Sequence, residues 1–144
     1  MDNIYLGIDF GLRRIGLAKS DPTGLIATAY KTIMYKSIKT AVAEIMADIE
    51  KFGIYGVVVG YPLASDGGNK GERCRMVDDF IERFQKNWRG PIYKIDERYS
   101  SSEAESMIHK HRKKIGRKKE RVDRMAAAII LQRFLDESPE HKKD

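Results

Sequence analysis

The first third of the chain alternates apolar positions with small or polar ones at a spacing of two, which is typical of β-strands. We expect strands over residues 4–10, 15–18 and 25–33, separated by turn sequences. Three strands in direct succession predict an antiparallel meander. Within the first strand, Asp9 falls on the same face as Gly7, where no other side chain crowds it.

From residue 37 onward the apolar spacing becomes three and four, as in an amphipathic helix. This spacing predicts a helix from Ser37 to Phe52 with Gly53 as its C-cap, and a second helix over about 72–87. The β-branched run 55–60 between them is typical of a buried parallel strand. A glycine-containing loop follows that strand.

The last third predicts one more strand, over 91–95, and two helices. The first of these helices begins near Ser101 or Ser102, and the second spans about 120–136. The positions of the second helix that we expect to face inward are Val122, Met125, Ala126 and Ile129. The resulting order, βββαβαβαα, predicts an α/β protein with a mixed sheet and helices on both faces.

Length and composition fit one globular domain. The chain has 144 residues, of which we assign 1–137 to the domain and 138–144 to a frayed tail. No apolar run is long enough to cross a membrane, and the first residues do not resemble a secretory signal. A single cysteine, Cys74, excludes an internal disulfide. We therefore expect a cytoplasmic protein with no membrane partner.

The positive charge is concentrated in one segment. The formal net charge is +6, and residues 109–124 hold nine basic and two acidic side chains, so the rest of the chain is close to neutral. A concentrated basic patch is the electrostatic footprint expected for a polyanion such as nucleic acid. The alternative is a solvated basic loop without a partner.

Three acidic positions stand out by their location. Asp9 lies inside a strand, Glu97 follows Asp96 at the end of another strand, and Asp123 lies in the first turn of the last helix. Carboxylates that converge at a sheet edge repel one another unless they share a divalent cation. Alternatively, Asp9 is a turn residue, the second acid pairs with Arg98, and Asp123 interacts with the helix dipole.

Four segments of the chain, in order, resemble the YqgF-type family of pre-16S ribosomal RNA nucleases, also described as Holliday junction resolvase-like. The resemblance covers nearly the whole chain and implies a ribonuclease H-like fold. The segments that carry it are Gly7-Ile8-Asp9-Phe10-Gly11-Leu12-Arg13-Arg14-Ile15-Gly16, Val58-Val59-Gly60-Tyr61-Pro62-Leu63, Asp96-Glu97-Arg98-Tyr99-Ser100-Ser101 and Val122-Asp123 with Ala126-Ala127.

The resemblance implies that Asp9, Glu97 and Asp123 are the catalytic acids and hold Mg²⁺ or Mn²⁺. Glu97 is chosen on the family motif, and Asp96 is the fallback. The implied reaction is metal-assisted hydrolysis of a phosphodiester. Basic residues near the acids and in the basic segment would bind the nucleic acid, with a solvated turn as the alternative for the first two. These residues are Arg13, Arg14, Arg98, Lys113, Lys114, Arg117, Lys118 and Lys119.

The implied function is processing of the 5′ end of precursor 16S ribosomal RNA, with the ribosome or its precursors as further partners. One alternative is a Holliday junction resolvase, which would act on four-way DNA as a dimer because the junction is two-fold symmetric. Another is a nucleic-acid-binding assembly factor that does not cleave. The sequence leaves the choice between monomer and homodimer open. An actin-like ATPase needs two lobes, and this chain supplies one.

Overall fold

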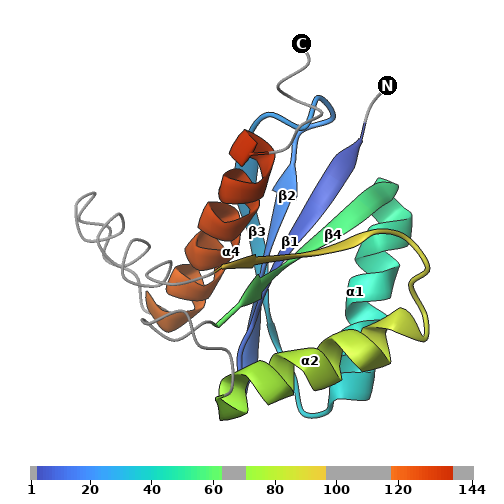
Figure 1. Cartoon of the computed structure of the whole chain (residues 1–144), viewed down its shortest axis with the longest axis vertical. Coiled ribbons are helices and arrows are strands. Elements are labelled where there is room, and N and C mark those ends of the chain that lie inside the picture. The colour runs from blue at the N-terminus through green and yellow to red at the C-terminus, as the bar shows by residue number, and fades with distance from the viewer. Residues whose placement is uncertain (1–2, 63–70, 97–117, 138–144) are drawn as a thin grey trace.

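A five-stranded mixed sheet lies between two helices on one side and one helix on the other in the computed structural model (Figure 1). The structure describes residues 3–62, 71–96 and 118–137. The predicted helix near Ser101, the glycine-containing loop 63–70 and the tail 138–144 lie outside the described residues. The elements are β1 (Ile4–Phe10), β2 (Arg14–Ser20), β3 (Ala27–Met34), α1 (Ile38–Phe52), β4 (Ile54–Tyr61), α2 (Glu72–Gln85), β5 (Ile92–Asp96) and α4 (Lys118–Glu137).

The strand order is β3-β2-β1-β4-β5. The pairs β1–β2 and β2–β3 are antiparallel, which confirms the predicted meander, and β1–β4 and β4–β5 are parallel. β3 begins two residues later than predicted. The Asp21 carboxylate accepts the backbone N–H groups of Leu25 and Ile26 at 2.9 and 2.8 Å, so these two residues belong to the turn.

Both predicted ends of α1 are confirmed. Ser37 is the N-cap, and its hydroxyl accepts the N–H of Thr40 at 3.2 Å. Gly53 closes the helix with a φ of 63°, in the left-handed region that glycine adopts without a steric penalty, and its N–H donates to the Ile49 carbonyl. A polar side chain thus begins the helix, and a residue without Cβ ends it.

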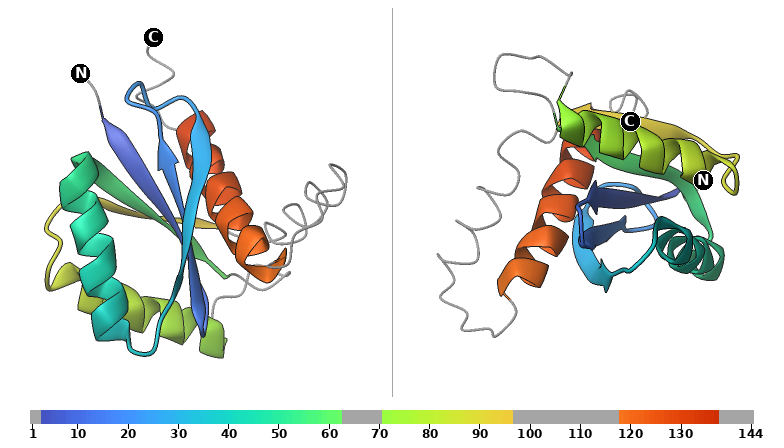
Figure 2. Two further views of the ribbon diagram at one scale, coloured as in Figure 1. Left: turned by 180° about the vertical axis from the view of Figure 1, so that it is seen from behind. Right: turned by 90° about the horizontal axis from the view of Figure 1, so that it is seen from below.

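The two faces of the sheet carry different side chains. Between α1, α2 and the face of the sheet that they cover lies a cluster of large apolar residues, among them Ile8 and Leu17 of the sheet and Phe80 of α2. The other face packs against α4 (Figure 2). Tyr5 and Leu131 lie in this contact, with smaller residues between them. The predicted inward face of α4 is only partly right. The fully buried residues of this helix are Ala126, Ala127, Ile130, Leu131 and Leu135.

Two glycines let α4 approach the sheet closely. A Cβ on Gly7 would lie 2.8 Å from the Leu131 Cβ, and a Cβ on Gly16 would overlap the backbone carbonyl of Asp123. At these two positions the sheet therefore has no room for a side chain. The close approach fixes where the first turns of α4 lie on the sheet.

None of the described helices is long and apolar enough to cross a membrane.

Candidate active site

The first carboxylate of the site, Asp9, lies near the end of β1 on the face that α4 covers. Its neighbours in sequence, Ile8 and Phe10, belong to the apolar cluster of the opposite face, so alternation directs Asp9 toward α4. Asp9 is only 8% exposed and is one of three buried polar or charged residues in the described part of the chain. A carboxylate at this depth is costly to bury unless charged or polar groups stabilise it.

The second carboxylate, Asp123, is brought to the same place by backbone packing. Gly16 is the partner of Asp9 in the β1–β2 register, and the backbone of Asp123 lies directly over Gly16. Directly opposed residues of an antiparallel pair share a face about 5 Å apart. Asp9 and Asp123 consequently line the same cleft, although 114 positions separate them in the sequence.

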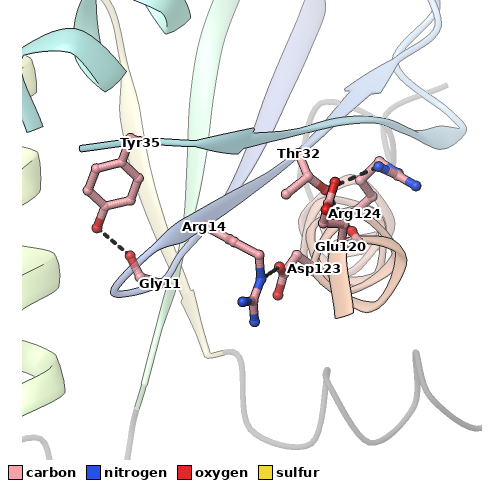
Figure 3. Close-up of polar contacts among 7 residues, drawn as sticks. All are labelled: Gly11, Arg14, Thr32, Tyr35, Glu120, Asp123 and Arg124. Atoms are coloured by element: carbon pink, nitrogen blue, oxygen red, sulfur yellow. Dashed lines mark hydrogen bonds and ion pairs between the residues drawn. The ribbon is translucent and has the colours of Figure 1, made fainter. Parts of the chain in front are cut away.

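The first turns of α4 are tied to the sheet by polar contacts. The Thr32 hydroxyl donates to the Glu120 carbonyl at 2.6 Å, and the Arg124 guanidinium donates to the same hydroxyl at 3.3 Å (Figure 3). The first contact occupies a carbonyl oxygen of α4 itself, while the second holds a side chain one turn further on. Together they fix the position of Asp123 between them.

Arg14, the first residue of β2, forms an ion pair with Asp123. Its Nε lies 2.6 Å from Asp123 Oδ2 (Figure 3). Burial raises the pKa of the Asp123 carboxyl, while the hydrogen bond and the charge of Arg14 act in the opposite direction. The carboxylate is thus short of solvent and depends on a neighbouring cation. The interpretation of Asp123 as a helix-dipole charge misses this partner.

A cleft of about 350 Å³ opens over these groups. Its remaining walls are the β1–β2 turn and the first turns of α2. Three arginines and two aspartates lie among its lining residues, which are Asp9, Phe10, Gly11, Leu12, Arg13, Arg14, Arg73, Met76, Val77 and Asp123. Such a mixture of cations and carboxylates suits a ligand that carries phosphate groups.

The structure therefore brings together Asp9, Asp123, Arg13 and Arg14. It adds Arg73, which the sequence analysis missed because nothing in the local pattern connects α2 with the end of β1. Lys119 is exposed near the start of α4, and the backbone of Lys118 begins that helix. The predicted site residues outside the described part of the chain are Glu97, Arg98, Lys113, Lys114 and Arg117.

For the fallback acid Asp96, strand alternation predicts the face opposite to that of Asp9 and Asp123. Tyr93 and Ile95 of β5 pack in the α4-side cluster, whereas Ile92 packs in the opposite one. Alternation therefore gives Asp96 the α2 side, where Lys94 contacts α2 through Asp78 at 3.1 Å. No group of three or more metal-binding side chains gathers within residues 3–62, 71–96 and 118–137.

Two solved Holliday junction resolvases have a fold similar to that of this chain. T. thermophilus RuvC in complex with a Holliday junction substrate superimposes with a TM-score of 0.56 at 14% identity, covering 92% of this chain and 93% of that one. The Fowlpox virus resolvase in complex with Holliday junction DNA gives 0.57 at 13% identity, covering 92% and 97%. This likeness shows a ribonuclease H-like fold and confirms the predicted fold class.

The chain belongs to the family described as RuvX: Holliday junction resolvase, whose model matches residues 3–137. A protein of Koribacter versatilis named as a pre-16S rRNA nuclease is 38% identical over 91% of this chain and 85% of its own length. A protein of the same name from Mycoplasmopsis synoviae is 38% identical over 91% and 96%. The predicted family is confirmed, and membership places the chain among enzymes that hydrolyse phosphodiester bonds.

Proposed function

We propose that the protein is a divalent-metal-dependent nuclease that processes the 5′ end of precursor 16S ribosomal RNA in the cytoplasm. The observation that carries this proposal is the convergence of a buried strand carboxylate, Asp9, and a helix carboxylate, Asp123, in one cleft with arginines on its walls. The names of the relatives from K. versatilis and M. synoviae support the RNA substrate.

The chemistry of the cleft fits a hard divalent cation. Its acidic groups are carboxylates, the ligands that Mg²⁺ and Mn²⁺ prefer. The Asp123 carboxylate is paired through Oδ2 with Arg14, so the ion would share this carboxylate with the arginine. In the proposal Asp9, Glu97 and Asp123 hold the ion. When bound, one or two ions supply an activated water and neutralise the leaving oxygen.

The remaining residues of the cleft bind and orient the substrate. Arg13 and Arg73 lie on two different walls, so each can bind a phosphate on its own side of the scissile bond. Arg14 holds the Asp123 carboxylate in one orientation and restrains it before substrate arrives. The basic segment, with Lys113, Lys114, Arg117, Lys118 and Lys119, and also Arg98, would hold more of the backbone. Binding should therefore weaken strongly with salt.

A cleavage assay tests the proposal. Wild type and Asp9→Asn are given a precursor-type RNA and a four-way DNA junction, with Mg²⁺, with Mn²⁺ and with EDTA. Asp136→Asn on the far end of α4 is the matched control, because Asp136 is exposed and its Oδ1 accepts a hydrogen bond from Gln132. We expect metal-dependent cleavage of the RNA, lost in Asp9→Asn and kept in Asp136→Asn.

The other outcomes separate the alternatives. Preferential cleavage of the junction by a dimer would favour resolvase activity, which the family description supports. Salt-sensitive binding without cleavage, equal in both proteins, would favour the assembly factor that does not cleave.

A further inference from the structure

Leu12 is the most exposed large apolar residue of the described part of the chain, with 74% of its surface accessible. It lies in the turn between β1 and β2 and lines the cleft with Asp9 and Asp123. Its apolar neighbours on either side along the chain, Phe10 and Ile15, are buried. A single exposed leucine is ordinary on a protein surface. Leu12, however, belongs to a turn that hydrogen bonds hold in place, and this turn lines the cleft beside the two carboxylates.

Backbone hydrogen bonds hold the turn in place. Gly11 N–H donates to the Arg14 carbonyl at 3.0 Å, which closes the turn. The Tyr35 hydroxyl donates to the Gly11 carbonyl at 2.6 Å (Figure 3). The Tyr35 N–H donates to the Arg13 carbonyl at 3.3 Å. Both carbonyls that flank Leu12 are therefore fixed by one residue at the end of β3.

Aromatic packing supports the same turn from below. The ring of Tyr35 lies 5.9 Å from that of Phe10, which in turn stacks on Phe80 of α2 at 4.6 Å. Gly11 adds a steric constraint, since a Cβ there would lie 2.7 Å from the Arg14 carbonyl oxygen. Leu12 and Arg13 are thus presented to solvent by a turn that is bonded and packed on its inner side.

The turn lines the same cleft as Asp9 and Asp123, so a strand bound with its phosphate at these carboxylates would lie beside it. Arg13 offers it a cation, whereas Leu12 offers only an apolar surface, which suits a base or sugar face and not a phosphate. In a duplex the base faces are stacked and inaccessible, while an unpaired nucleotide exposes them. Proteins insert leucine and other apolar side chains between the bases of a duplex only at the cost of unstacking them, a cost that an unpaired base does not carry.

We propose that Leu12 contacts the face of an unpaired base beside the scissile phosphate, so that the enzyme prefers single-stranded over base-paired cleavage sites. This inference rests on the proposed nuclease function and adds the substrate feature that the site selects. Arg13 in the same turn binds the adjacent phosphate, so one short segment supplies both contacts.

The test compares one RNA strand, alone and annealed to its complement, with wild type, Leu12→Ala and Leu25→Ala. Leu25 is the matched control, because it is also a leucine in a β-turn, 57% exposed, but at the opposite end of β2. The strand carries 2-aminopurine at several positions, so its fluorescence reports base contacts as well as cleavage. Both substitutions are at exposed sites, and circular dichroism is used to check that both variants fold.

We expect the wild type and Leu25→Ala to cleave the single strand faster than the duplex. In Leu12→Ala this preference should fall about tenfold, which corresponds to about 1.4 kcal/mol. An unchanged preference in Leu12→Ala overturns the inference and leaves the nuclease function standing. If no protein cleaves RNA, the proposed function fails. The fluorescence then decides: a 2-aminopurine change lost only in Leu12→Ala supports the base contact, and an equal or absent change overturns it.

Discussion

The two faces of the sheet differ in how tightly and with which side chains they pack against their helices. Under α1 and α2, large side chains such as Phe10, Phe80 and Phe84 stack on one another at 4.6–5.8 Å and form a continuous apolar layer. Under α4, Gly7 and Gly16 take the place of large residues, and the helix is held partly by polar contacts. The first face holds the larger apolar cluster. On the second face glycines stand in place of larger side chains, so α4 packs close to the sheet and Asp123 lines the same cleft as Asp9.

The largest difference between the faces should be in their contribution to stability. Phe80→Ala should lower the free energy of unfolding by about 3–5 kcal/mol, because it opens a cavity in the packed layer. Phe134→Ala on α4 should cost less, on the order of 1–2 kcal/mol, because Phe134 is only partly buried. Urea unfolding followed by circular dichroism measures both. Equal losses would contradict the comparison.

Gly16→Ala should affect both stability and activity. The added methyl group would meet the backbone of Asp123, so α4 must move away from the sheet at a cost of about 1–3 kcal/mol. Cleavage should fall at temperatures where the variant is still folded, since the displacement separates Asp123 from Asp9. Gly71→Ala is the control, because no described part of the chain lies within 4 Å of a Cβ there. If Gly16→Ala were as active as Gly71→Ala, the close approach would not matter for the site.

The smallest effect concerns a carboxylate at the far end of β2. The Thr23 hydroxyl, followed by the N–H groups of Ile26, Leu25 and Thr23 itself, lowers the pKa of Asp21 from 3.8 to about 2. Its contribution to stability is therefore present above pH 3.8 and is lost as the pH falls toward 2. Asp21→Asn should unfold at lower urea than wild type near neutral pH, and the difference should shrink at about pH 2. A constant difference would show that the charge is irrelevant.

The sequence predicted the parts of the molecule that depend on local pattern. The period of two in residues 4–10 identified β1 and the face of Asp9, and Gly53 marked the end of α1. Contacts between distant segments were not predictable in this way. The Arg14–Asp123 pair joins residues 109 positions apart, and the need for glycine at position 16 appears only when α4 lies on it. The exposure of Leu12 likewise depends on the turn that Tyr35 holds, and Tyr35 is 23 positions away in the sequence.

Asp9 and Asp123 lie in one cleft, and we propose that they hold a divalent cation there. Electron paramagnetic resonance of free Mn²⁺ measures this directly, by titrating the ion into the full-length wild type, Asp9→Asn, Asp123→Asn and the control Asp136→Asn. We expect Mn²⁺ to bind to the wild type and to the control Asp136→Asn. In Asp9→Asn and Asp123→Asn, binding should be weakened at least about tenfold. Equal binding to all four proteins, or none to the wild type, would contradict it.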